Sequence, residues 1–95
     1  MGHSPAEHIQ QGFSVRGRVQ GVGFRWWTRT MGSDLGLVGA VRNLPDGSVE
    51  AHVAGPAQAV QAFAAELARG PLGAQVDRVE RIVSDRPLPS DFVIE

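Results

Sequence analysis

The stretch GFSVRGRVQGVGFRWWTRTMGSDLG, residues 12–36, changes its hydrophobic period halfway along. Up to Val19, apolar and polar side chains alternate, which is the pattern of a strand with one buried face. After a glycine-bearing loop, apolar residues recur from Phe24 at the spacing of one helix face, until Gly36 offers a helix end. The apolar positions are Phe13, Val15 and Val19 in the strand, and Phe24, Trp27, Met31 and Leu35 in the helix. The stretch therefore predicts a strand, a loop and a helix.

The remaining sequence predicts a hairpin, a second helix and further strands. The turn Pro45-Asp46-Gly47 lies between two strand-like runs, and Asp-Gly in that position is typical of a hairpin. Pro56 is expected at the first position of the second helix, which ends before Gly70. The expected strands are residues 37–44, 48–54, 76–84 and a possible short fifth strand at Phe92 and Ile94. The order βαββαβ predicts a ferredoxin-like α+β sandwich, an antiparallel sheet with both helices on one face.

Composition narrows the class of protein. The chain has 95 residues, 42% hydrophobic and 20% charged, which fits one globular domain and not a disordered chain. Its net charge of −1 argues against a nucleic-acid partner, and its apolar runs are too short to span a membrane. It has no cysteine, which excludes disulfides, cysteine nucleophiles and thiolate metal sites and fits a reducing, cytoplasmic location. Nothing in the sequence indicates an oligomer, so we expect a monomer.

The loop between the first strand and the first helix, Gly17 to Arg25, is the candidate site. Main-chain N–H groups at a helix start lack helical partners, and glycines let several of them approach one anion. Arg25 adds a planar cation that suits phosphate oxygens. The spacing matches neither the P-loop nor the dinucleotide fingerprint. From these residues alone, the loop is either a pocket for a small oxyanion or a tight turn with a surface arginine.

The string GRVQGVGFR, residues 17–25, resembles the signature of the acylphosphatase family. Residues 35–39 (LGLVG) and 41–50 (VRNLPDGSVE) resemble the second block of that family, and the helix between Gly55-Pro56 and Gly70-Pro71 is similar too. The similarity extends from about Phe13 to Val79. It implies a flexible N-terminal lead-in over residues 1–10 and a single acylphosphatase-like domain over residues 11–95.

The resemblance implies hydrolysis of acyl phosphates to a carboxylate and inorganic phosphate, which would also inhibit as the product. It assigns Arg25 and Asn43 as catalytic: Arg25 holds the phosphate, and Asn43 orients the attacking water. It implies no metal ion and no organic cofactor. The phosphate-binding residues it implies are Gly17, Arg18, Val19, Gln20, Gly21, Val22 and Arg25. Two of these roles have simpler alternatives, because Asn43 could only shape the turn and the Gln20 side chain could only brace it.

Two other functions remain as alternatives. An RNA-binding module would need exposed aromatic residues on a basic sheet face, and the chain has no Tyr. A non-catalytic module that binds an anion such as carbamoyl phosphate, as in larger proteins with acylphosphatase-like domains, would keep the same loop. Two departures from the family pattern stand out: Gly32 is expected to loosen the first helix, and Ala40 to open the outer sheet face near Asn43. Trp27 is expected in the core, Trp26 partly exposed and His52 facing outward.

Overall fold

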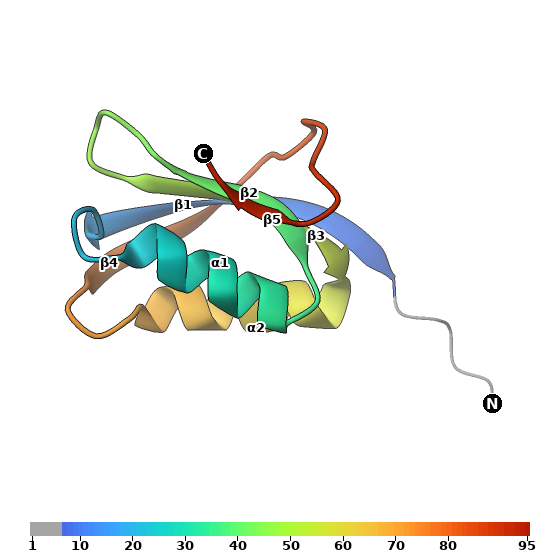
Figure 1. Cartoon of the computed structure of the whole chain (residues 1–95), viewed down its shortest axis with the longest axis horizontal. Coiled ribbons are helices and arrows are strands. Elements are labelled where there is room, and N and C mark those ends of the chain that lie inside the picture. Colours follow the sequence, from blue (N-terminus) through green and yellow to red (C-terminus); the bar gives the residue numbers. More distant parts are fainter. Residues whose placement is uncertain (1–6) are drawn as a thin grey trace.

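The computed structural model describes residues 7–95 and has the predicted order of elements. Both helices cover one face of a five-stranded sheet, as Figure 1 shows. The elements are β1 (His8–Arg18), α1 (Phe24–Asp34), β2 (Val38–Asn43), β3 (Val49–Pro56), α2 (Ala57–Arg69), β4 (Gln75–Ile82) and β5 (Phe92–Ile94). The predicted α+β sandwich with an added C-terminal strand is therefore confirmed. No helix in residues 7–95 has the length and apolar character needed to cross a bilayer.

The sheet is mixed, which corrects the expected all-antiparallel sheet. Its strand order is β4-β1-β3-β2-β5, and the first four strands pair antiparallel. Strand β5 pairs parallel with β2, with Phe92 opposite Gly39. The cause is the connection over residues 83–91, which carries the chain from one edge of the sheet to the other. Alternation in so short a strand does not reveal its direction.

The bounds of β2, β3 and β4 differ from the expected ranges by one or two residues, and two boundaries differ more substantially. Strand β1 begins at His8, inside the range 1–10 taken as a lead-in, because its first residues pair with the end of β3 at Pro56. Residues 1–6 of that range lie outside the described residues. Pro56 closes β3 and caps α2 instead of being the first helical residue, since its ψ of 139° is extended.

Helix α1 faces the core with a slightly different stripe from the one predicted. Its buried residues are Phe24, Thr28 and Gly32, four apart, whereas Trp27 is half-buried. Gly32 is needed at this position because a Cβ there would overlap the Phe92 ring of β5. Gly32 therefore fits the last strand against the helix, a role that the sequence alone did not indicate. The core of the molecule consists of Phe13, Val15, Val19, Phe24, Leu37, Val41, Val49, Ala51, Val53, Val60, Phe63, Leu67 and Phe92.

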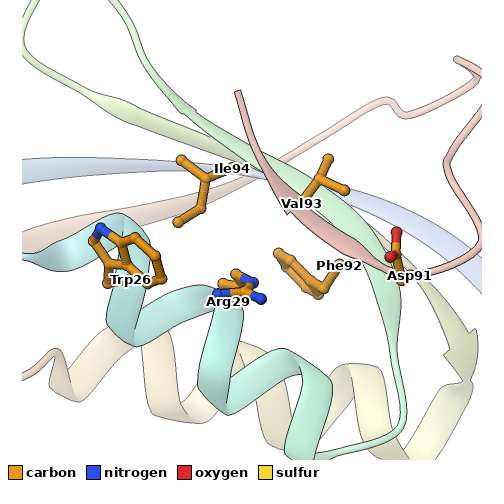
Figure 2. Close-up of a pocket in the computed structure, with 6 residues that line it drawn as sticks. All are labelled: Trp26, Arg29, Asp91, Phe92, Val93 and Ile94. Atoms are coloured by element: carbon orange, nitrogen blue, oxygen red, sulfur yellow. The ribbon is translucent and has the colours of Figure 1, made fainter.

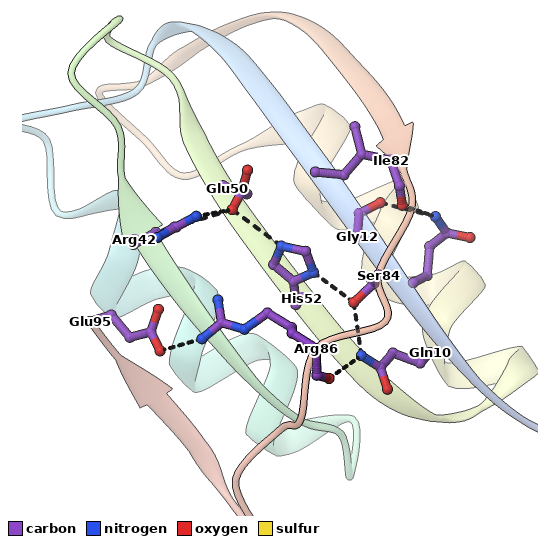
Figure 3. A network of polar contacts seen from close by, with 10 residues as sticks. Gln10, Gly12, Arg42, Glu50, His52, Ile82, Ser84, Arg86 and Glu95 are labelled. Atoms are coloured by element: carbon purple, nitrogen blue, oxygen red, sulfur yellow. Dashed lines mark hydrogen bonds and ion pairs between the residues drawn. The ribbon is translucent and has the colours of Figure 1, made fainter.

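The outer sheet face is closed near Ala40, contrary to the expectation that it would be open. Ala40 is only 1% exposed and lies opposite His52 on β3. His52 does face outward from the helices, but its side chain is 8% exposed because residues after β4 cross over it (Figure 3). Its Nδ1 lies 2.6 Å from the Ser84 hydroxyl oxygen. The C-terminal connection thus takes the place of a large side chain on this face.

A chain of polar contacts fixes that connection on the sheet. Glu50 Oε1 accepts from Arg42 Nη2 at 2.8 Å and lies 3.2 Å from His52 Nε2. Because a carboxylate only accepts, Nε2 carries a proton, and in the neutral imidazole Nδ1 accepts from Ser84. Burial acts to raise the pKa of Glu50, but the hydrogen bonds from Arg42 and His52 outweigh it and lower that pKa. Figure 3 shows that these residues join β2 and β3 to the connection.

Candidate active site

A pocket of about 220 Å³ opens where α1 begins, next to the end of β2. It brings together the two residues expected to be catalytic, Arg25 from the start of α1 and Asn43 from the last position of β2. The other lining residues are Val19, Gly21, Gly23, Phe24 and Trp26. The predicted site residues that are far apart in sequence therefore share one pocket.

The loop presents main-chain amides at the start of α1. Gly23 is the N-cap with φ of 76°, and no side chain caps the first turn. The first amides of α1 therefore keep their capacity to bind an anion, helped by the partial positive charge of the helix start. The first turn also contains no acidic residue that would repel an anion.

Gly17 sets the position of the loop relative to β4. Its φ of 132° is unfavourable for other residues, and a Cβ there would overlap the main chain at Gln75. The pairing register of β1 with β4 shifts between Arg16 and Gly17, as at a β-bulge. The bulge interrupts the regular ladder just before the last two pairs, Gly17 with Val76 and Arg18 with Gln75. Gly17, the first of the predicted phosphate-binding residues, is therefore required to be glycine by its backbone conformation and by its close approach to β4.

Arg25 is half-buried and is held at the end of β5. Its Nη1 donates to the main-chain oxygen of Glu95 at 3.2 Å. A guanidinium has five N–H donors in a planar fork, so this bond leaves others available to a ligand in the pocket. The contact with Glu95 was not predicted, because no local pattern links residues seventy positions apart.

Asn43 is half-buried, and its Oδ1 has no hydrogen-bond partner although that atom is buried. The hairpin turn is closed by other groups: Leu44 N donates to Ser48 O, and Asp46 Oδ1 accepts from the Ser48 main chain and hydroxyl. An unsatisfied buried carbonyl costs about 1–3 kcal/mol, so such a group calls for an explanation. The geometry therefore argues against the simpler alternative that Asn43 only shapes the turn.

The Gln20 side chain braces the loop against the hairpin. Its Nε2 donates to Leu44 O at 2.8 Å and to Ser48 O at 2.9 Å. Both side-chain N–H donors are thus occupied, which agrees with the bracing alternative and leaves the Gln20 main-chain amide for an anion. The hairpin is further tied to β1 by an ion pair of 3.3 Å between Arg16 and Asp46. Hydrogen bonds from Ser48, with the nearby Arg16 charge, lower the pKa of Asp46.

The other predicted phosphate-binding residues would bind phosphate through their main-chain amides more than through their side chains. Arg18 is exposed, the Val19 side chain is buried in the core, and Val22 packs against that core. Sequence reasoning missed Trp26 as a lining residue of the pocket, although it predicted that Trp26 would be partly exposed. In residues 7–95, no group of three or more His, Asp or Glu side chains has an arrangement that could hold a metal ion.

The fold and the pocket define a class: small α/β sandwich proteins with an oxyanion site at the start of the first helix. Comparisons with known proteins make this specific. The family model described as "Acylphosphatase" matches residues 11–94. An acylphosphatase of Mesorhizobium japonicum is 53% identical over 81 residues, which cover 84% of this chain and 86% of that protein. The solved structure of an acylphosphatase from Coxiella burnetii superposes with a TM-score of 0.83 at 34% identity, over 93% of both chains.

The chain belongs to the acylphosphatase family. Its activity is that of the family, hydrolysis of acyl phosphates to a carboxylate and inorganic phosphate. A third similarity is to T. kodakarensis HypF, with a TM-score of 0.77 and 30% identity over 92% of this chain. The match covers 12% of HypF, so the same sandwich also occurs as a small part of a much longer protein.

Proposed function

We propose that the main-chain amides of residues 17–22 and the Arg25 guanidinium hold the phosphate of the substrate, while Asn43 positions the water that attacks it. The observation that carries this proposal is that Arg25 and Asn43, distant in sequence, line one pocket at a helix start that no side chain caps. The amides and the guanidinium supply positive groups, and the Asn43 side chain supplies a polar amide beside them that orients the water.

The chemistry follows from these groups. The water oxygen attacks phosphorus, the bond from phosphorus to the acyl oxygen breaks, and the acyl group leaves as a carboxylate. Charge develops on the peripheral phosphate oxygens, where preorganised donors stabilise it. A neutral amide is no base, so Asn43 orients the water and a phosphate oxygen of the substrate takes its proton. This route uses no metal ion or organic cofactor, because Arg25 and the amides provide the electrostatic stabilisation.

The sequence alone also allowed a non-catalytic module that binds an anion, but the acylphosphatase relatives at 51–53% identity favour the enzyme. The two functions share the amides and Arg25, but only the enzyme needs Asn43 to position water. Release of phosphate from benzoyl phosphate by the purified protein separates them, since a binding module would hold the anion without turnover.

We further propose that the protein acts as a cytoplasmic monomer on a small molecule, without nucleic-acid or membrane partners. The absence of cysteine and the near-neutral charge support this setting. Trp26, Leu72 and Val83 are the large apolar side chains exposed in the described residues, and they come from three separate segments. Sedimentation analysis at micromolar concentration checks the mass, and a dimer would contradict the proposal.

Arg25→Lys tests the proposed phosphate site. The guanidinium can hold two phosphate oxygens, whereas an ammonium is a point charge, so the variant should lose both turnover of benzoyl phosphate and affinity for inorganic phosphate. We expect turnover to fall by roughly 100-fold, the scale of one lost preorganised donor. In the wild type, phosphate should inhibit competitively, raising KM at constant kcat.

Arg69→Lys is the matched control, because Arg69 lies exposed in the last turn of α2 and pairs only with Glu66. It should keep wild-type kinetics. A folded Arg25→Lys variant with wild-type turnover would show that the guanidinium is not in the site.

A further inference from the structure

A second depression adjoins the phosphate pocket, between α1 and β5. It has a volume of about 390 Å³ and is lined by Trp26, Arg29, Asp91, Phe92, Val93 and Ile94. Figure 2 shows Trp26 and Arg29 on the helix, with Phe92 and Ile94 of the strand extending toward it. Trp26 lines both this groove and the phosphate pocket, so the two depressions adjoin at that side chain. An acyl group attached to a phosphate at Arg25 would therefore need only to pass Trp26 to enter the groove.

The groove combines apolar walls with one unneutralised cation. Trp26 is 64% exposed, and the Arg29 guanidinium lies over its ring at 5.3 Å from the centroid. Within residues 7–95, Arg29 forms no ion pair. Five of the nine arginines in residues 7–95 form ion pairs, namely Arg16, Arg42, Arg69, Arg78 and Arg86. The stacked guanidinium is thus held in place while its charge remains available to a ligand.

The spacing of the two arginines fits a ligand with two anionic ends. Arg25 and Arg29 are four residues apart on α1, which puts them on one helix face about 6 Å apart along the axis. Like charges at this spacing repel each other mildly, and an anion between or beside them relieves that repulsion. An acyl phosphate with a distal carboxylate presents one anion to each arginine and its carbon skeleton to Trp26.

We propose that the groove is the acyl subsite and that Arg29 selects acyl phosphates whose acyl group carries a second carboxylate. The proposal rests on the proposed function, because it needs the phosphate to be held by Arg25 in the adjoining pocket. It names a substrate class, monophosphorylated dicarboxylic acids, and gives Arg29 a role in specificity.

Asp91 is the one acidic side chain that lines the groove. Its negative charge would repel the distal carboxylate of a substrate that extended as far as Asp91. In Figure 2, Arg29 lies between Trp26 and Phe92, and Asp91 lies beyond Phe92. A carboxylate on a short acyl group therefore meets Arg29 before it approaches Asp91. Removing the Asp91 charge should make the groove more favourable to an anion, the opposite of removing Arg29.

The test compares two substrates of nearly equal shape. One is 4-carboxybenzoyl phosphate, and the other is 4-carbamoylbenzoyl phosphate, in which a neutral amide replaces the distal carboxylate. The measured quantity is the ratio of their kcat/KM values at low ionic strength. We expect the wild type to prefer the carboxylate by about five-fold, the size typical of a solvent-exposed ion pair, and to lose the preference as salt is added.

Arg29→Gln should bring the ratio close to one, because it removes the charge from an exposed helix position and leaves the helix intact. Arg69→Gln, which removes an exposed arginine from α2, should keep the wild-type ratio. Asp91→Asn should give a ratio at or above that of the wild type. A wild-type ratio of one or less, an unchanged ratio in Arg29→Gln, or a fall in all three variants would overturn the proposal.

Failure of the subsite is distinguishable from failure of the proposed function. If the wild type hydrolyses both substrates equally and Arg25→Lys does not, the phosphate site stands and the role of Arg29 is wrong. If the wild type hydrolyses neither substrate nor benzoyl phosphate, the proposed catalytic site itself is wrong.

Discussion

Asn43 is the residue at which stability and activity make opposite demands. Its buried Oδ1 has no partner, which costs folding free energy, while the adjacent turn is closed by Asp46 and Ser48. Asn43 also lines the pocket that contains Arg25, where a polar amide can orient a water. Strain and unsatisfied groups that persist in a fold are often found at functional sites.

Asn43→Ala should therefore reduce turnover without weakening the fold. We expect kcat and kcat/KM to fall together by roughly 100-fold, because the lost interaction acts mainly in the transition state. Affinity for inorganic phosphate should stay within a few-fold, and the midpoint of thermal unfolding should not drop, since an unsatisfied group is removed. Steady-state kinetics, calorimetric titration and thermal melts of one preparation measure all three.

Ser48→Ala is the control for a turn-shaping role, because its hydroxyl bonds to Asp46. It should lower stability and keep the turnover of the folded protein. If Asn43→Ala instead behaves like Ser48→Ala, with lower stability and wild-type turnover, Asn43 only shapes the turn.

The sequence singled out Arg25 and Asn43 because both lie in strings that resemble blocks of the acylphosphatase family. It could not find the bond from Arg25 to Glu95, or that Trp26 lines two adjoining depressions. Those facts depend on where β5 pairs, and a three-residue strand with weak alternation does not specify its partner. Long-range contacts of this kind carry no local signal.

At the scale of elements, the fit of α1 against β5 depends on one missing methyl group. A Cβ on Gly32 would overlap the Phe92 ring, and that ring packs on Phe63 with centroids 6.0 Å apart. The glycine is unfavourable for the helix by about 1 kcal/mol relative to Ala, but it lets helix and strand approach closely.

Gly32→Ala should destabilise the protein although alanine is the better helix former. We expect a net loss of about 1–2 kcal/mol in the free energy of unfolding, because overpacking of a core outweighs the gain in helix propensity. Urea unfolding measures it. Ser33→Ala, at the exposed neighbouring position, should be neutral or slightly stabilising. A Gly32→Ala protein more stable than the wild type would contradict the close fit, and Phe92→Leu in the same chain should restore part of the loss.

The sequence predicted which helices and strands form. It predicted less well how the edge strand pairs and which segment covers the outer sheet face. The change of period at Phe24 and the Asp46-Gly47 turn are local signals. Helix α1 begins at Phe24 and the β2–β3 hairpin turns at Asp46-Gly47, as predicted. The parallel pairing of β5 and the burial of Ala40 are products of the connection that crosses the outer face, whose residues have no periodic pattern. Tertiary packing decides such features, so local propensity does not reveal them.

At the scale of the whole molecule, two carboxylates make the free energy of unfolding depend on pH below neutrality. The pKa of Asp46 is lowered by hydrogen bonds from Ser48 and by Arg16. The pKa of Glu50 is lowered because the hydrogen bonds from Arg42 and His52 outweigh its burial. A lowered pKa in the folded state means that the unfolded chain binds protons first as the pH falls. The stabilisation is therefore complete above the unfolded pKa values, about 4, and is lost below them.

We expect the free energy of unfolding to be nearly constant from pH 7 to about pH 5 and to fall as the pH drops through 4 toward 3. Urea unfolding at several pH values measures the slope. The double variant Asp46→Asn/Glu50→Gln should be less stable at pH 7 and should show a shallower decline in acid. An equally steep decline in that variant would mean that other groups cause the acid sensitivity.

The strand order has a consequence for how the chain is made. Strand β1 lies between β3 and β4 and is made before both, so it has no partner on either side until residue 56, and none on its second side until residue 82. During that interval Phe13 and Val15 are exposed on a strand with two open edges, the kind of segment that pairs with other nascent chains. Arg16 and Arg18 follow these apolar residues directly, and charges beside an apolar strand oppose such pairing. Arg16 and Arg18 therefore also disfavour pairing of β1 with other chains before β3 and β4 have been made.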